Sequence, residues 1–239
     1  MAKFALVHGA WHNKRCWEGV IEQLRKKGHE AEAVTLAGNG PDEDRRGITY
    51  KDIVRSLVEF IGRQETPVVL VGHSSAGHVI QVAVPKVPDR IEKIVFNNAW
   101  VLPHGKSQFD LIPDRQAVDG MRKGAAASGC NAIPLIDGFI RSALAYGVPK
   151  EKQDELIAIL VPQPVALFET AADTEAFAGL PIPKVLLYCK DDVSLPPGVY
   201  LGMYRTLGDN PVVEIDGNHE TLYFQPDRFS RGLIDCLNA

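Results

Sequence analysis

The segment that most constrains the fold is residues 68–77, where an apolar run meets a cluster of small residues. Val68 to Val71 are typical of a buried strand, and Gly72-His73-Ser74-Ser75-Ala76-Gly77 follows directly. A strand that turns sharply into a helix at a serine needs small neighbours, because the turn is strained and the two elements pass close together. The usual pattern is G-x-S-x-G, from which Ala76 departs by one methyl group. The segment predicts a nucleophile elbow, although glycine- and serine-rich turns also build phosphate loops.

Short apolar runs alternate with helix-periodic segments along most of the chain. Trp17, Val20, Ile21 and Leu24, for example, fall on one helical face, and Gly28 supplies a stop. Such alternation is typical of βαβ units, so we expect an α/β fold with a mostly parallel six-stranded sheet flanked by helices. The expected strands span residues 4–7, 31–36, 68–71, 94–97, 185–189 and 212–215.

The alternation stops between residues 102 and 181. This stretch has no convincing strand and contains two helical patterns, at about 135–146 and 150–160. Ligands bind at the carboxyl ends of the strands in open α/β sheets, so the simplest interpretation is a small helical cap over that edge. We predict a core at 1–101 and 182–239 and a cap at 102–181. The alternative is a peripheral insertion with a structural role only.

Composition excludes several classes of protein. The 239 residues are 45% hydrophobic and 23% charged with a net charge of −4, which indicates a globular chain without the basic surface that nucleic acids require. No apolar run reaches the roughly 18 residues that span a bilayer, and the amino terminus has no signal-peptide pattern. The four cysteines are far apart and predict reduced thiols in a cytoplasmic protein rather than a disulfide or metal framework: Cys16, Cys130, Cys189 and Cys236.

A serine nucleophile needs a base, and the base needs an acid that orients it. Asp191 and Asp192 follow the expected strand at 185–189, and His219 follows the next strand, 27 residues after Asp192. The order serine, acid, histidine, with each residue just beyond a strand, is the order of an α/β-hydrolase triad. Spacing alone leaves either aspartate as the acid.

Over nearly its whole length the chain resembles the α/β-hydrolases of the plant methylesterase and hydroxynitrile lyase group and their bacterial esterase relatives. Four motifs carry the resemblance: residues 4–11 (FALVHGAW), residues 72–77 (GHSSAG), the turn at 189–192 with Pro196, and the His219 loop with Pro226. The resemblance implies the α/β-hydrolase fold.

The resemblance also implies the roles of individual residues. Ser74 is expected to be the nucleophile, His219 the base and Asp192 the acid, since Asp192 stands four residues before Pro196 as in the family turn. The backbone N–H groups of Ala10 and Ser75 are expected to form the oxyanion hole. Trp11, Trp100 and Phe168 are candidates for the substrate pocket, with core packing as the alternative. Among the other histidines, we expect His73 to pack beside the nucleophile, and His8 and His12 to shape the oxyanion loop.

These expectations point to a serine hydrolase without cofactor or metal that cleaves a small ester, or a related carbamate, amide or lactone. A hydroxynitrile lyase is the first alternative. Such lyases carry a threonine in the first loop and a lysine after the catalytic histidine, where this chain has Gly9 and Glu220. A ligand receptor that keeps the triad and a cofactor-free oxygenase are further alternatives. The expected partner is a small-molecule substrate, and a homodimer is left open.

Overall fold

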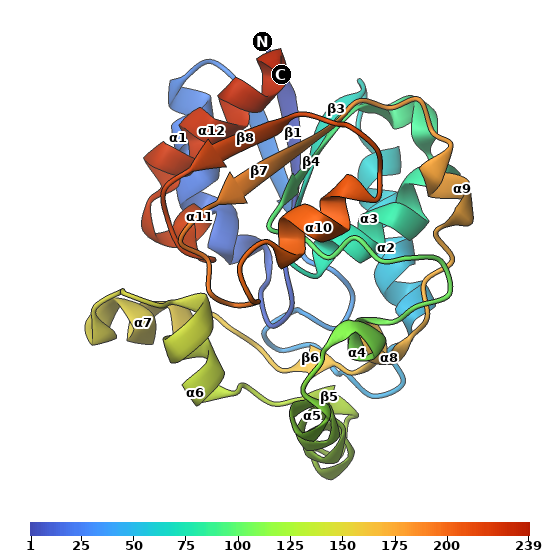
Figure 1. The fold of residues 1–239 in the computed structure, drawn as a ribbon, viewed down its shortest axis with the longest axis vertical. Coiled ribbons are helices and arrows are strands. Elements are labelled where there is room, and N and C mark those ends of the chain that lie inside the picture. Colours follow the sequence, from blue (N-terminus) through green and yellow to red (C-terminus); the bar gives the residue numbers. More distant parts are fainter.

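The computed structural model describes residues 1–239 and centres on one six-stranded sheet in the order β2-β1-β3-β4-β7-β8 (Figure 1). Every neighbouring pair in this sheet is parallel, which confirms the predicted α/β class. All six predicted strands are present, with ends that differ by a few residues. The strands are β1 (Lys3–Val7), β2 (Glu30–Val34), β3 (Val68–His73), β4 (Ile91–Asn97), β7 (Lys184–Cys189) and β8 (Val212–Ile215).

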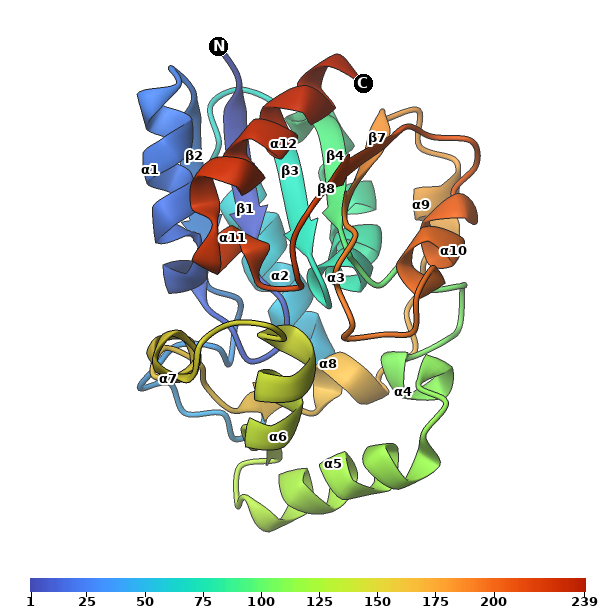
Figure 2. The ribbon, with the colours of Figure 1, turned by 60° about the vertical axis from the view of Figure 1, so that its left-hand side comes forward.

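Helices cover both faces of the sheet. Figure 2 shows α1 and α12 in front of the strands, and α2 and α3 behind them. The helices of this core are α1 (Glu18–Lys26), α2 (Tyr50–Gly62), α3 (Ala76–Ala83), α10 (Val199–Arg205), α11 (Thr221–Phe224) and α12 (Pro226–Asn238). The capping box between Thr49 and Asp52 defines where α2 begins, because each residue satisfies a backbone N–H of the first turn.

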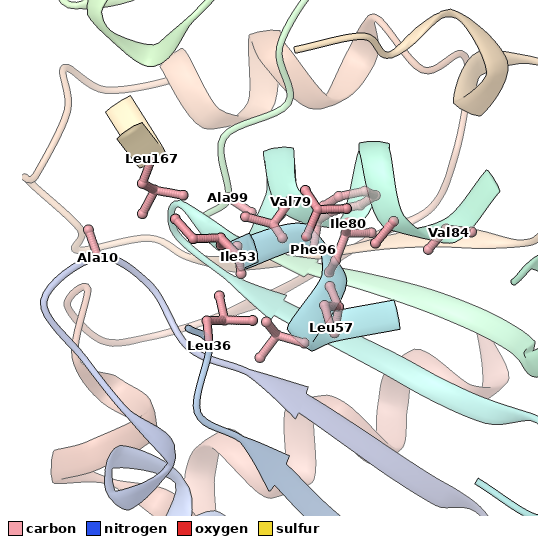
Figure 3. Close-up of a cluster of buried hydrophobic side chains, with 14 of the residues drawn as sticks. Ala10, Leu36, Ile53, Leu57, Val79, Ile80, Val84, Phe96, Ala99 and Leu167 are labelled. Carbon is pink, nitrogen blue, oxygen red and sulfur yellow. The ribbon is translucent and has the colours of Figure 1, made fainter. Parts of the chain in front are cut away.

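Successive strand residues point to opposite faces, and each face forms its own core. Phe4 and Leu6 of β1 pack with the α1 and α12 side, whereas Ala5 and Val7 pack with the α2 and α3 side. Figure 3 shows part of the second core, in which the side chains of α2 and α3 meet those of the sheet. Its labelled residues are Ala10, Leu36, Ile53, Leu57, Val79, Ile80, Val84, Phe96, Ala99 and Leu167.

The turn between β3 and α3 requires its small residues. A Cβ on Gly77 would lie 2.6 Å from the Trp100 carbonyl oxygen, and a Cβ on Gly72 would overlap Ile80 Cδ1. Ser74, at the apex, has a φ of 53°, in the left-handed region that a side chain seldom adopts. The close packing of β3 and α3 therefore holds a strained serine at the carboxyl end of the sheet.

Most of residues 102–181 lies beyond the carboxyl ends of the strands in both ribbon views, but its last helix, at residues 175–178, runs back beside the sheet (Figures 1 and 2). The segment is mostly helical, but it also contains a two-residue antiparallel strand pair, which the sequence analysis did not predict. Its elements are α4 (Gln108–Leu111), α5 (Arg115–Ala127), β5 (Ala132–Ile133), α6 (Asp137–Phe139), a π-helical turn (Ile140–Leu144), α7 (Lys150–Ile157), β6 (Gln163–Pro164), α8 (Ala166–Glu169) and α9 (Glu175–Ala178).

The helix predictions in this segment were partly wrong. The pattern at 135–146 forms the short α6 and a π-helical turn, and the helix predicted at 150–160 ends at Ile157. The longest helix here, α5, was missed because Gly120 and Gly124 lower its intrinsic helix propensity. None of the helices in the structure is both long and apolar enough to cross a membrane.

Candidate functional site

Ser74 is fixed by backbone hydrogen bonds on both sides of the elbow. Its N–H donates to the Asn97 carbonyl at 3.1 Å, and its own carbonyl accepts from the N–H groups of Gly77 and Trp100. Neighbouring strand ends thus hold the serine, and its side chain lines a largely apolar cavity.

This cavity has a volume of about 590 Å³ and lies between the carboxyl edge of the sheet and residues 102–181. Most of its lining is hydrophobic, including Ile112, Met121, Ile136, Phe139 and Leu195, and no lysine or arginine takes part. Apart from Asp114, at the start of α5, the polar lining residues come from the loops at the carboxyl edge of the sheet, as Ser74 does. A pocket of this kind fits a small, largely apolar molecule that is held at one polar end.

Asp192 and His219 meet at the edge of this cavity. Asp192 Oδ2 lies 2.7 Å from His219 Nδ1, and both side chains are almost fully buried. The carboxylate is saturated with donors: Oδ2 also accepts from Asn98 Nδ2 at 2.7 Å, and Oδ1 accepts from the Ser194 N–H and hydroxyl. Because Nδ1–H of His219 donates a hydrogen bond to the carboxylate, the Nε2 atom of the neutral ring carries no proton and can accept one.

The two pKa values shift in the directions that an ion pair requires. Burial acts to raise the pKa of Asp192, but His219 and the hydrogen bonds from His219 and Ser194 outweigh it and lower the value to about 2. Burial acts to lower the pKa of His219, but Asp192 and then Glu220 raise it above 6.5. His219 is therefore a stronger base than an isolated imidazole.

The adjacent Asp191 points elsewhere. Its Oδ2 accepts the Gly217 N–H at 2.8 Å, and its own N–H donates to the Gly217 carbonyl, so this exposed carboxylate stabilises the turn below His219. The structure thus brings Asp192 to the histidine and leaves Asp191 on the outside. Ser74 and His219 share the cavity without a mutual hydrogen bond, a contact that is often long in free enzymes and tightens with substrate.

The two predicted oxyanion donors border the cavity beside Ser74. The N–H groups of Ala10 and Ser75 have no acceptor within the protein. His8 Nδ1 lies 2.8 Å from the Gly9 carbonyl, which belongs to the same peptide as the Ala10 N–H. Because carbonyl and N–H point in opposite directions across a trans peptide, this contact fixes the direction of the Ala10 N–H.

Trp11, Trp100 and Phe168 all line the cavity and are also buried, so each serves the pocket and the core together. The indole of Trp11 packs on Phe168 with ring centroids 5.5 Å apart and donates to the Pro134 carbonyl. These aromatic groups join the first loop to residues 102–181.

Several neighbours of this site were not predicted. Asn98 follows a buried strand at the same edge of the sheet, a position that could have identified it. Ser194 and Tyr200 carried no comparable signal, because the fold of the turn after Asp192 places them. The Ser194 hydroxyl lies 3.1 Å from His219 Nδ1 and 3.0 Å from the Tyr200 hydroxyl, and both residues line the cavity.

Below His219 lies a second buried polar cluster. Glu220 Oε2 is 3.1 Å from His12 Nε2, and the His73 ring packs 4.4 Å from the His219 ring. Donor atoms of His73, His219 and Glu220 lie within 4.8 Å of one another, as metal ligands do. His219 and Glu220 Oε2 have the partners described above, whereas His73 Nε2 and Glu220 Oε1 are buried without a hydrogen-bond partner in the protein.

Comparison with known proteins places this geometry in context. The model of the alpha/beta hydrolase family matches residues 4–231. A carbendazim hydrolyzing esterase from Nocardioides sp. (strain SG-4G) is 31% identical over 179 residues, which cover 71% of this chain and 72% of the relative. Methylesterase 2 from Arabidopsis thaliana is 28% identical over 97% of this chain and 94% of its own length.

A solved structure is also very similar. It is an extracellular alpha/beta-hydrolase from a Paenibacillus species, described as sharing structural and functional homology with tobacco salicylic acid binding protein 2. The two chains superpose with a TM-score of 0.92 at 29% identity, over 98% of each. The resemblance inferred from the sequence motifs is confirmed at the level of the family.

Proposed function

Because the chain belongs to the alpha/beta hydrolase family and is an esterase-like hydrolase, we propose that it cleaves a small ester through a covalent acyl-enzyme on Ser74. The observation that supports this proposal most strongly is the buried 2.7 Å contact between Asp192 and His219 at the wall of the cavity that contains Ser74. The strained φ of Ser74, at the apex of its turn, is a second support.

The proposed reaction has two halves. In the first, Ser74 Oγ attacks the ester carbonyl while His219 Nε2 takes its proton, and Asp192 stabilises the imidazolium. The N–H groups of Ala10 and Ser75 bind the oxyanion. The carbon–oxygen bond to the alcohol then breaks, and His219 gives its proton to the leaving oxygen. In the second half a water molecule, deprotonated by His219, releases the acid and restores Ser74.

The proposed substrate is an uncharged, largely apolar ester that fits a cavity of about 590 Å³. Absence of lysine and arginine from the lining argues against a substrate anchored by a carboxylate or phosphate. The names of the relatives include a methylesterase and a carbendazim hydrolyzing esterase, so a short alcohol or a carbamate fits the same proposal.

In this proposal residues 102–181 form the helical cap that closes the site and selects the acyl group. A cytoplasmic location stays a prediction from the sequence, and the similar Paenibacillus structure is described as extracellular.

A substrate panel tests the proposal. Methyl esters, p-nitrophenyl esters and methyl carbamates of the same apolar groups are offered to the protein and to Ser74→Ala, with acid or nitrophenol release as readout. We expect multiple turnover with at least one apolar ester and none with Ser74→Ala. A protein that binds these compounds without turnover would be a receptor, and the proposal would be wrong.

A further inference from the structure

Tyr200 is a buried hydroxyl group in the wall of the active cavity that the proposed triad leaves unused. It stands in the first turn of α10 with 4% of its surface exposed, and its ring stacks along His219 with centroids 6.1 Å apart and an angle of 23° between the planes. Its hydroxyl lies 3.0 Å from Ser194 Oγ.

Hydrogen-bond directions around Ser194 determine what this hydroxyl can do. The Ser194 proton is committed to Asp192 Oδ1 at 2.6 Å, because a carboxylate only accepts. Ser194 Oγ is therefore an acceptor for its other neighbours, and Tyr200 must donate to it. A phenol proton rotates about its C–O bond, so the same proton can turn toward a substrate atom in the cavity.

Tyr200 keeps this proton over the working pH range of an esterase. Burial raises its pKa well above 10, as does the charge of Asp192, and the Ser194 and Ser74 hydroxyls lower it only in part. The Tyr200 and Ser74 side chains line the same cavity. Tyr200 is a neutral donor beside the nucleophile and is not a second base.

The leaving oxygen of an ester has only one place in this geometry. It is bonded to the carbon that Ser74 attacks, and it must reach His219 Nε2 to receive a proton. It therefore lies between Ser74 and His219, in the cavity that Tyr200 also lines with its ring along His219. On this basis, and resting on the proposed function, we infer that the Tyr200 hydroxyl donates a hydrogen bond to the leaving alcohol oxygen and favours esters of poorly leaving alcohols.

The step balances without Tyr200 losing its proton. As the carbon–oxygen bond breaks, the electron pair goes to the alcohol oxygen, and His219 Nε2 transfers its proton there. Tyr200 only donates a hydrogen bond to the charge that develops before that transfer is complete. An alkoxide such as methoxide is a poor leaving group and needs this hydrogen bond. In p-nitrophenolate the charge is delocalised over the ring, so this group leaves readily.

The test compares a methyl and a p-nitrophenyl ester of the same acid in Tyr200→Phe. We expect kcat/KM for the methyl ester to fall roughly 10- to 100-fold, because the variant loses a hydrogen bond to a charged leaving oxygen. For the p-nitrophenyl ester we expect a fall of less than about threefold. Tyr204→Phe is the matched control: it removes another tyrosine hydroxyl of α10, which donates to the Pro211 carbonyl away from the cavity, and should change neither value.

Ser194→Ala supplies a second comparison. Ser194 acts through Asp192, which both esters need, so its loss should lower both values by the same factor. If Tyr200→Phe lowers kcat/KM by the same factor for both esters, or lowers it for neither, the leaving-group role is wrong. If the proposed function itself were wrong, the result would be different: the Ser74→Ala variant would turn over both esters normally.

Discussion

Glu220 Oε2 lies 3.1 Å from His12 Nε2, and neither side chain reaches solvent. His12 Nδ1 faces the Ala10 carbonyl at 2.8 Å, which can only accept, so the pair links the residue after His219 to the loop that carries Ala10. Burial acts to raise the pKa of Glu220, but His12, His73 and His219 outweigh it and lower the value to about 2. A second buried carboxylate therefore stands beside His219.

Glu220→Gln should move the pH profile to lower pH. Glu220 and Asp192 together hold the His219 pKa above 6.5, and only neutral imidazole accepts the serine proton, so kcat/KM of the wild type should fall as pH drops through that raised value. Without the Glu220 charge the fall should occur at lower pH. Profiles from pH 5 to 9 measure the shift, with the exposed Glu214→Gln as control. A shift to higher pH would contradict this account.

The same substitution should weaken the fold. Breaking a buried ion pair on one side costs about 3 kcal/mol or more of unfolding free energy. Because the folded pKa of Glu220 is about 2, below its ordinary 4.5, the pair stabilises the protein above pH 4.5 and loses this effect as pH falls toward 2. Urea denaturation should show the variant's deficit at pH 7 and a smaller deficit at pH 3. A constant deficit would mean that packing, and not charge, was lost.

Asp192→Asn and Asp191→Asn should differ sharply. Asparagine at 192 lacks the charge that stabilises the imidazolium and favours the wrong tautomer of His219, so it should reduce kcat by about 10³- to 10⁴-fold. Asparagine at 191 only weakens an exposed turn contact with Gly217 and should leave kcat within about threefold, since a screened surface charge has little effect. Measuring kcat of both variants on one ester checks this. The reverse order would assign the acid to Asp191.

His8→Phe should impair the oxyanion hole without moving the pH profile. His8 holds the Gly9 carbonyl and also accepts the Leu36 N–H at 3.0 Å, and burial lowers its pKa to about 3, so it is neutral throughout pH 5 to 9. We expect kcat to fall roughly tenfold because the Ala10 N–H loses its fixed direction. The loss should be equal at every pH. A pH-dependent loss would mean that His8 acts through its charge.

The protein should not release cyanide from cyanohydrins. No lysine or arginine lines the cavity, and Glu220, where the lyases carry a lysine, faces His12. A Cβ on Gly9 would lie 2.8 Å from Ser74 Cβ, so Gly9→Thr should distort the elbow and not create a lyase. Mandelonitrile should decompose no faster with the wild type than with Ser74→Ala. Ser74-dependent cyanide release would assign the chain to the lyases.

The sequence predicted the parts of this protein that depend on local pattern. Most sheet strands contain a short apolar run, and Ser74, Asp192 and His219 each follow a strand, so a parallel sheet brings their positions to one edge. The elbow could be predicted from the sequence because steric crowding at Gly72 and Gly77 restricts these positions to small residues.

What the sequence could not predict depends on the path of long connections. Tyr200 and Ser194 meet His219 because of how the turn after Asp192 folds, and His12 meets Glu220 across 208 residues of chain. In residues 102–181 the helices are short and packed on the core, so tertiary contacts override propensity, as the missed α5 illustrates.

Covalent labelling of Ser74 tests the central claim most directly. A fluorophosphonate should modify the protein at one residue and abolish ester hydrolysis, with peptide mass spectrometry locating the adduct on the peptide that contains Ser74. The Ser74→Ala variant should take up no label and lose about 10⁴-fold or more in kcat while unfolding at the same temperature. Label on another residue, or normal turnover by Ser74→Ala, would contradict the account.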